Sequence, residues 1–200
     1  MRMEILFLDA EFTGLEQEGE LMSLAIVSKG GQHFYAEFTD FEESRLSDWH
    51  REHVLPFMLL QEGGRKEDLP ESGTYYRGRR KGVLPVLKAW LGQWDAVVFW
   101  GDVPAYDWVL FCDLFGGALN LPGHIHFVVR DLATFFELEG YDVNIGRFDF
   151  VDSKVKGRAP FPLVQHNALA DAWIGLQCLI KLQTLKLDST DGCICKENEG

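Results

Sequence analysis

The first apolar run of the chain ends in two carboxylates. Residues 4–15 read EILFLDAEFTGL, so the run presents Asp9 and Glu11 before it breaks at Gly14. Successive side chains of a strand point to opposite faces, so Asp9 and Glu11 are expected on one face at the end of a buried strand. Adjacent carboxylates repel each other, and burying an unpaired charge is costly. The pair is therefore either solvated at an ordinary strand end or binds hard divalent cations, which prefer oxygen ligands.

The composition indicates one globular domain with a substantial core. The chain has 200 residues, of which 46% are hydrophobic and 13% aromatic, and such values exclude a disordered chain. Its N-terminus lacks the apolar region of a signal peptide, and its apolar runs fall short of the ~18 residues of a membrane helix. We expect a cytoplasmic protein without a membrane partner, with a domain over residues 1–185 and a flexible tail over 186–200.

The four cysteines fit a reducing compartment. Cys112 and Cys178 lie inside apolar runs and are expected to be small buried hydrophobes. Cys193 and Cys195 lie in a polar tail, where two thiols are too few for a closed zinc site.

Hydrophobic patterning predicts three strands followed by alternating helices and strands. The first three strands are expected at 3–11, 21–28 and 33–39, with a hairpin-like turn between the last two. Further strands are expected at 96–100 and 125–129, long loops at 61–81 and 140–164, and helices at 47–60, 83–94, 104–115, 132–139 and 166–184. An antiparallel meander followed by alternating elements predicts an α/β fold, with a mixed sheet of three antiparallel strands plus parallel strands, flanked by helices.

This element order resembles the ribonuclease-H-like fold. A doubly wound dinucleotide-binding fold is the weaker match, because it would need parallel strands from the start and a glycine-rich first turn. The first turn here reads FTGLEQEGE, which is acidic and would repel a pyrophosphate.

Further acids occur where such a fold would bring them near Asp9. Asp102 follows the strand at 96–100, and Asp107 lies about one turn into the next helix. The terminal helix opens with QHNALADAW, which contains His166 and Asp171. Five residues of helix separate side chains by about 140°, so these two converge more easily if His166 precedes the helix. Each of these residues alone could equally be a turn, capping or surface residue.

Two basic segments stand out against a net charge of −12, a balance that argues against a polyanion partner. Residues 77–88 and 153–158 carry several cations and no acid. Each segment alone fits a solvated loop, but two of them beside a carboxylate site favour contacts with phosphates. The candidate phosphate-binding residues are Arg79, Arg80, Lys154, Lys156 and Arg158.

The ordered set of motifs resembles the DEDD superfamily of 3′–5′ exonucleases, in its histidine-bearing (DEDDh) branch. LDAEFTGLE matches the first motif of that branch and HNALAD the third. The second motif is commonly Asn-x-x-Phe-Asp, whereas this chain has GDVPAYD. An aromatic residue precedes Asp107, which aligns it with the third acid, and Asp102 is the alternative. The AYD form resembles a small branch of mycobacterial-type 3′–5′ exoribonucleases, and the resemblance spans about residues 4–180.

The resemblance implies two Mg²⁺ or Mn²⁺ ions and hydrolysis of single-stranded or short RNA to nucleoside 5′-monophosphates. Asp9 would bridge the ions, Glu11 and Asp171 would bind one, and Asp107 the other, with His166 as general base. Substrate contacts are expected from Phe12, Thr13 and Tyr106, of which Phe12 and Tyr106 would stack on terminal bases. Core packing is the alternative role for Phe12.

Several alternatives remain open at the level of sequence. The motifs do not separate RNA from DNA, because a contact to the 2′-hydroxyl is invisible in sequence. A ribonuclease-H-like domain could also bind nucleic acid or protein without cutting it, and a hydrolase of sugar or nucleotide phosphates is a third reading. The sequence also leaves open a homodimer.

Overall fold

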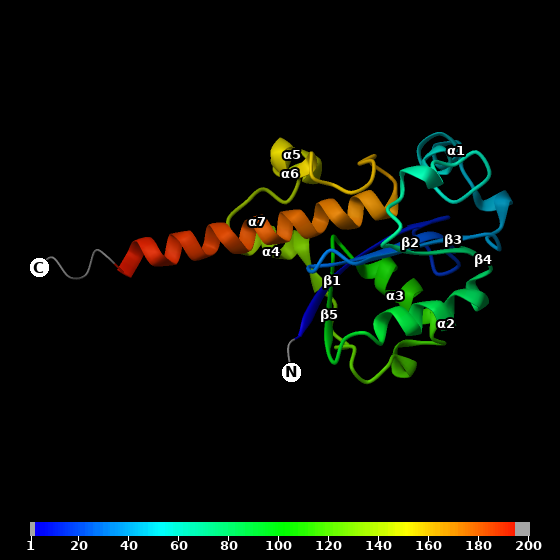
Figure 1. Ribbon diagram of the computed structural model, residues 1–200, viewed down its shortest axis with the longest axis horizontal. Helices are drawn as coiled ribbons and strands as arrows, with labels where there is room; N and C mark the ends of the chain where they lie inside the picture. Colours follow the sequence, from blue (N-terminus) through cyan, green and yellow to red (C-terminus); the bar gives the residue numbers. More distant parts are fainter. Residues whose placement is uncertain (1–2, 195–200) are drawn as a thin grey trace, which may run out of the picture.

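A six-stranded mixed sheet forms the centre of the protein in a computed structural model, which describes the backbone of residues 3–194 and the side chains of residues 3–187 (Figure 1). The first three strands form an antiparallel meander, while β5 pairs parallel with β1, β4 with β3, and β6 with β5. The strand order β4-β3-β2-β1-β5-β6 confirms the predicted α/β fold of the ribonuclease-H-like type. The strands are β1 (Glu4–Phe12), β2 (Leu21–Ser28), β3 (His33–Phe38), β4 (Thr74–Gly78), β5 (Val97–Gly101) and β6 (Arg130–Asp131).

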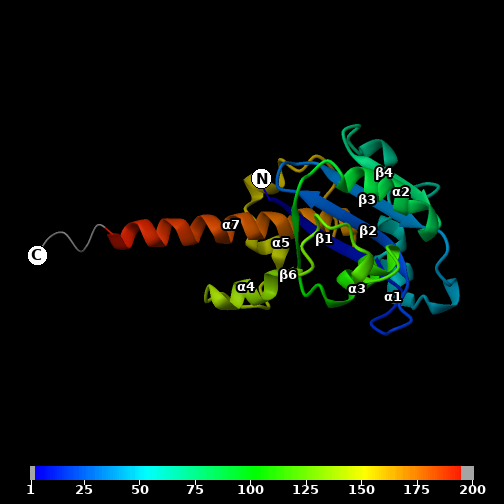
Figure 2. The same ribbon diagram turned by 90° about the horizontal axis from the view of Figure 1, so that it is seen from below.

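Helices cover both faces of the sheet, and each face has its own hydrophobic core (Figures 1 and 2). The alternation of β1 sends Phe7 into one core, and Leu6 and Leu8 into the other. On the Phe7 face lie α4 (Leu132–Leu138), α5 (Arg147–Phe150), α6 (Ser153–Lys156) and α7 (Ala168–Ile194). On the opposite face lie α2 (Arg80–Leu91) and α3 (Ala105–Leu114). The short elements are α1 (Asp48–His53), η1 (Glu43–Arg45), η2 (Leu55–Phe57), η3 (Lys66–Asp68) and η4 (Ala118–Asn120).

Helix α7 crosses β1 at a close contact between Gly175 and Phe7. A Cβ atom on Gly175 would lie 2.3 Å from Cε1 of the Phe7 ring. The ring is fully buried in the core and cannot move aside without disturbing its neighbours. Gly175 lies one turn after Asp171 on α7. Glycine at this position therefore sets the distance between helix and strand, and with it the position of Asp171 relative to β1.

Gly175→Ala is expected to destabilise the protein. Helix propensity favours alanine by about 1 kcal/mol, but overpacking a closed core costs about 1–3 kcal/mol, so we expect a net loss of about 1 kcal/mol. Urea unfolding followed by circular dichroism measures the difference. Gly123→Ala is the matched control, because a Cβ there meets no atom within 4 Å. Equal midpoints for the two variants would contradict the role of Gly175.

Two sequence-based expectations were wrong. The strand expected at 125–129 is a single bridge between Ile125 and Val97. Ile125 is buried in the core on the α2 and α3 face, but Phe127 is 75% exposed and Val128 is exposed as well. The loop expected at 61–81 contains β4, which pairs parallel with β3 because Thr74 and the two tyrosines after it suit an edge strand.

The helix boundaries also differ in detail. Helix α2 begins at Arg80, so Pro85 lies inside the helix and not in its first turn. The loop expected at 140–164 contains α5 and α6. Ser47 caps α1, and Asp131 caps α4. Helix α7 begins at Ala168 and runs to Ile194, beyond the predicted end at 184.

The apolar cysteines Cys112 and Cys178 are free and buried, as expected. No side chain is described for Cys193, and Cys195 lies outside the described residues. Within the described part of the chain, no helix combines the length and the apolar character needed to cross a membrane.

Candidate active site

Asp9 and Glu11 lie on the α7 face of β1, where the strand extends past its parallel neighbour β5. The pairing of β1 with β5 ends at Phe7 and Trp100, while its pairing with β2 continues through Asp9 and Glu11. The register shifts between Glu11 and Phe12, an irregularity of the kind that redirects side chains near functional sites. The two acids therefore lie at the carboxyl ends of β1 and β5. The crevice beyond these strand ends is the usual place for ligands in α/β sheets.

Asp107 reaches this crevice from the first turn of α3. Its Oδ1 atom accepts a hydrogen bond from the backbone N–H of Ala10 at 2.8 Å. Ala10 lies between Asp9 and Glu11, so the bond holds Asp107 beside the acidic pair. The N-terminal end of a helix also favours a carboxylate.

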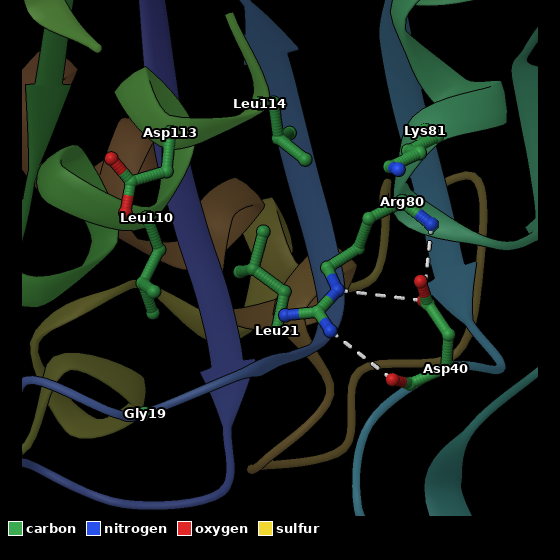
Figure 3. Close-up of a pocket in the computed structure, with 8 residues that line it drawn as sticks. All are labelled: Gly19, Leu21, Asp40, Arg80, Lys81, Leu110, Asp113 and Leu114. Carbon is green, nitrogen blue, oxygen red and sulfur yellow. Dashed lines mark hydrogen bonds and ion pairs between the residues drawn. The ribbon is translucent and has the colours of Figure 1, made fainter. Parts of the chain in front are cut away.

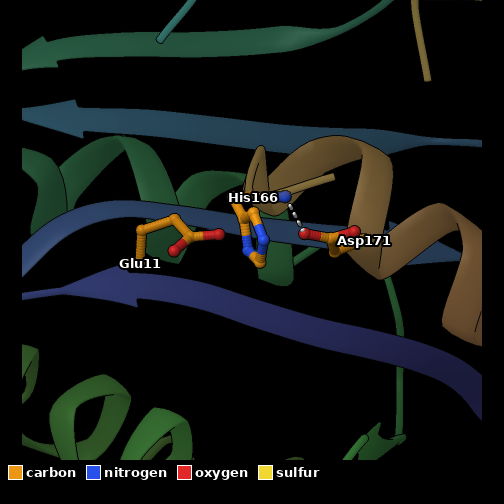
Figure 4. A group of neighbouring side chains, drawn as sticks. All are labelled: Glu11, His166 and Asp171. Carbon is orange, nitrogen blue, oxygen red and sulfur yellow. Dashed lines mark hydrogen bonds between the residues drawn. The ribbon is translucent and has the colours of Figure 1, made fainter. Parts of the chain in front are cut away.

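Asp171 and His166 enter from the start of α7 (Figure 4). Oδ2 of Asp171 accepts a hydrogen bond from the backbone N–H of His166 at 2.8 Å. His166 has a φ of 62°, in the left-handed region, and lies in the loop before the helix, the position from which the spacing predicts easier convergence with Asp171. One possible ligand atom from each of Glu11, His166 and Asp171 lies within 4.8 Å of the other two.

The acids have raised pKa values, and burial is the largest cause for each. Repulsion from Asp171 and Asp107 adds to it for Asp9 and Glu11, and repulsion from Asp102 adds to it for Asp107 and Asp171. The pKa of Glu11 rises to about 8, that of Asp171 to about 7 and that of Asp107 to about 6. The pKa of Asp9 is raised by burial, then by Asp171, Asp107 and Glu11. Four acids from three elements thus form one cluster of negative charge that a cation would stabilise.

Asp102, the alternative third acid, is bound to an arginine. Nε of Arg147 lies 2.8 Å from its Oδ2 and Nη2 lies 3.0 Å from its Oδ1, a bidentate ion pair. Nη1 of Arg147 also donates to the carbonyls of Val143 and Ile145. The charge of Asp102 is therefore compensated within the protein, which favours Asp107 as the free acid.

The ring of His166 packs against two aromatic residues of α1. Its centroid lies 4.9 Å from that of Trp49, edge to face, and 6.3 Å from that of His53. Burial and then the neighbouring His53 lower the pKa of His166 below its ordinary value. A neutral imidazole at pH 7 can accept a proton, which is what a general base must do.

A cavity of about 260 Å³ opens beside the acids, lined in part by Asp9, His166, Asp171 and Phe148. Lys156 donates from Nζ to the carbonyl of Phe148 at 2.8 Å, so its ammonium group is bound to a residue that lines this cavity. Lys154 and Arg158, each two residues from Lys156 in the chain, have exposed side chains.

Phe12 and Tyr106 lie next to each other, with ring centroids 6.0 Å apart. The hydroxyl of Tyr106 donates to the carbonyl of Leu15 at 2.6 Å, which connects α3 to the loop after β1. Thr13 is buried, and its Oγ1 accepts from the N–H of Glu20 at 3.1 Å. Thr13 therefore holds the loop in the structure. Phe12 packs in part against the core on the α2 and α3 face, as its alternative role required, and Tyr106 is exposed, so stacking of these rings on bases stays a prediction.

In the basic segment at the start of α2, Arg80 forms ion pairs within the protein. Arg80 pairs with Glu20 at 2.8 Å and with Asp40 at 3.5 Å, and the second pair borders a cavity of about 310 Å³ on the α2 and α3 face (Figure 3). Arg79 is exposed. Phosphate binding by Arg79 or Arg80 stays a prediction, and the paired charge of Arg80 makes it the weaker candidate.

Sequence reasoning missed three groups that surround the site. Arg147, Trp49 and Asn167 touch predicted site residues, either directly or through the backbone. Asn167 could have been found, because asparagine directly before an apolar helix is a favoured N-cap. The contacts of Arg147 and Trp49 join distant segments and leave no local signal.

Comparison with known proteins agrees with this geometry. The family model of the Rv2179c-like 3′–5′ exoribonuclease domain matches residues 4–182, nearly the whole chain. The chain therefore belongs to this family of 3′–5′ exoribonucleases, which are hydrolases, and the suspected resemblance is confirmed.

Two relatives carry matching names. One is the 3′–5′ exoribonuclease Rv2179c of Mycobacterium tuberculosis (strain ATCC 25618 / H37Rv), and the other is the 3′–5′ exoribonuclease MT2234.1 of M. tuberculosis (strain CDC 1551 / Oshkosh). Each is 28% identical to this chain over 167 residues, which cover 83% of this chain and 85% of the relative.

Proposed function

We propose that this protein is a metal-dependent 3′–5′ exoribonuclease that shortens single-stranded or short RNA and releases nucleoside 5′-monophosphates. The observation that carries the proposal is the convergence of Asp9, Glu11, Asp107 and Asp171 from β1, α3 and α7, with His166 beside them. Membership in a family named for exoribonuclease activity supports RNA as the substrate.

The donor set fits hard divalent cations. Four carboxylates supply only oxygen ligands, which suit Mg²⁺ and Mn²⁺ better than the softer metals. Their raised pKa values reflect a repulsion that positive charge would relieve. We propose that Asp9 is shared by two ions, that Glu11 and Asp171 hold one, and that Asp107 holds the other. Bound there, the ions would stabilise the attacking and leaving oxygens of an in-line displacement.

His166 acts as the general base in the proposed reaction. Its imidazole accepts a proton from the water that attacks the terminal phosphate, and the bond from phosphorus to the 3′ oxygen of the preceding nucleotide breaks. The ring must be neutral to accept this proton, and the lowered pKa of His166 favours the neutral form at pH 7. Phe12 and Tyr106 would stack on the terminal bases, which tolerates any sequence.

A labelled-strand assay tests the proposal. A short RNA labelled at its 5′ end is incubated with the protein and Mn²⁺, and in parallel with EDTA. We expect a ladder that shortens from the 3′ end with Mn²⁺ and an intact strand with EDTA. A DNA strand of the same sequence and a long RNA duplex are assayed in the same way for comparison. Intact RNA under both conditions would refute the function, and faster cleavage of DNA would change the substrate class.

The cluster predicts how pH and metal act on stability. Unfolded carboxyl groups titrate near pH 4, whereas Glu11, Asp171 and Asp107 in the folded protein have pKa values of about 8, 7 and 6. Between about pH 4 and pH 8 the folded state binds more protons than the unfolded state. The free energy of unfolding of the metal-free protein should therefore fall as pH rises through this range.

Divalent metal should reverse this loss. Metal ions compete with protons for the same carboxylates, so they bind more tightly at pH 8 than at pH 5.5. Mn²⁺ at about 100 times its Kd adds about 2.7 kcal/mol of stability, or about 5–10 °C in Tm for a chain of this length. Thermal unfolding with and without Mn²⁺ at the two pH values measures the effect. An equal shift at both values would argue against these carboxylates as ligands.

A further inference from the structure

A chain of buried polar groups runs from the middle of the sheet to the residue after His166. It consists of Tyr35 and Glu37 on β3 and Asn167 at the start of α7. The side chains of Tyr35 and Glu37 are fully buried and that of Asn167 is 4% exposed. Buried polar groups are costly unless they are hydrogen-bonded, so their connections decide what they do.

Asn167 holds the start of α7 in place. Its Oδ1 accepts from the N–H groups of Leu169 at 3.1 Å and Ala170 at 3.2 Å, which makes it the N-cap of the helix. Its Nδ2 donates to the carbonyl of Phe57 at 2.7 Å and to the hydroxyl of Tyr35 at 3.4 Å. The amide group of Asn167 is therefore oriented by contacts from both directions.

Glu37 completes a closed circuit with the segment that follows α1. Its Oε1 accepts from the hydroxyl of Tyr35 at 2.8 Å and from the N–H of Leu60 at 2.7 Å. Residues 57–60 are thus held at one end by Asn167 and at the other by Glu37, with Tyr35 between them. Oε2 of Glu37 is buried without a hydrogen-bond partner among the described residues, so Oε1 carries both bonds.

This circuit borders both sides of the proposed base. His166 directly precedes Asn167 and adopts a φ of 62°, a conformation that a residue other than glycine keeps only when its surroundings hold it. The segment held at residues 57–60 leads back to α1, whose Trp49 packs on the ring of His166. Loosening the circuit would release the His166 loop and the aromatic contact together.

We propose that Tyr35 and Glu37 are positioning residues, which act through Asn167 to hold His166 in the geometry that proton transfer requires. Both side chains are buried, and neither residue is among those proposed to bind substrate or metal. The inference rests on the proposed exoribonuclease function for its kinetic test, but its structural part can be measured without activity.

Tyr35→Phe removes the central hydroxyl and keeps the ring in the core. The hydroxyl donates to Glu37 at 2.8 Å and accepts from Asn167 at the longer distance of 3.4 Å. We expect their loss to lower kcat about three- to tenfold, while KM stays within about twofold. Glu37→Gln keeps an oxygen acceptor for Tyr35 and Leu60, and should retain kcat within about twofold. Tyr75→Phe is the matched control, because its hydroxyl contacts His33 and Pro70 instead of the His166 loop.

A double mutant separates positioning from general destabilisation. In the His166→Ala background, Tyr35→Phe should cause no further loss of kcat, because residues that act through one group are not additive. Hydrogen exchange of the amides of His166, Leu169 and Ala170 should also be faster in Tyr35→Phe than in Tyr75→Phe. An unchanged kcat in Tyr35→Phe, an equal loss in both backgrounds, or equal exchange rates would overturn the inference.

The exoribonuclease function and the positioning role of Tyr35 can be refuted separately. If the wild-type protein does not shorten RNA, the exoribonuclease function is wrong, and the exchange rates alone then decide whether Tyr35 holds the loop. If the wild-type protein shortens RNA and Tyr35→Phe does so at the same rate, only the positioning role is wrong.

Discussion

Asp9→Asn should reduce the rate of RNA hydrolysis on the order of 10³-fold or more, even at saturating Mn²⁺. Asp9 is close enough to Glu11, Asp107 and Asp171 that all three raise its pKa. An amide in its place removes a charged ligand from the middle of the cluster. Metal ions contribute several kcal/mol to stabilising such a transition state, and each 1.36 kcal/mol is a factor of ten in rate.

The same substitution should stabilise the metal-free protein at pH 8. The folded state no longer has to accommodate a buried carboxylate among other acids, so Tm is expected to rise while activity disappears. Thermal unfolding and the labelled-strand assay are measured on one preparation. Asp113→Asn is the control, because Asp113 is exposed on α3 and borders the cavity on the opposite face. Similar activities for the two variants would remove Asp9 from the site.

His166→Ala should slow hydrolysis by about 10²–10⁴-fold, the range for loss of a positioned general base. Its affinity for Mn²⁺ should change little, because the four carboxylates remain. The residual rate should also lose the dependence on pH that a titrating base imposes. This dependence is measured under single-turnover conditions between about pH 5 and pH 7, where a histidine with a lowered pKa changes charge.

The metal affinity distinguishes a base from a ligand. A ring atom of His166 lies within 4.8 Å of ligand atoms of Glu11 and Asp171, which is compatible with either role. A loss of more than about tenfold in Mn²⁺ affinity would show that His166 is a metal ligand. Losses of this size are seen when groups that support a metal site are removed. His126→Ala is the control, since His126 is exposed and stacks only on Phe127.

The parts of the fold that could be predicted from sequence are those with a local signal. The alternation in EILFLDAEF defined β1 and placed Asp9 and Glu11 on one face. The antiparallel pairing of β1 with β2 agrees with the predicted three-strand meander. The spacing from His166 to Asp171 indicated a histidine outside the helix, and the structure has it there.

The remaining parts depend on contacts between distant segments. The choice between Asp102 and Asp107 turns on Arg147, which lies 45 residues from Asp102 in the chain. Thr74–Gly78 reads as loop because charge and glycine surround it, and only the free edge of β3 makes it a strand. The apolar segment at 125–129 has the composition of a strand, but only Ile125 pairs with β5, and Phe127 and Val128 are exposed, so composition alone was misleading.

Anomalous diffraction from crystals soaked in Mn²⁺ tests the site most directly. We expect two anomalous peaks in the crevice at the carboxyl end of β1, bordered by Asp9, Glu11, Asp107 and Asp171, and their loss in Asp9→Asn. Peaks elsewhere on the surface, or none at Mn²⁺ concentrations that support hydrolysis, would contradict the assignment of these four acids as the metal-binding centre.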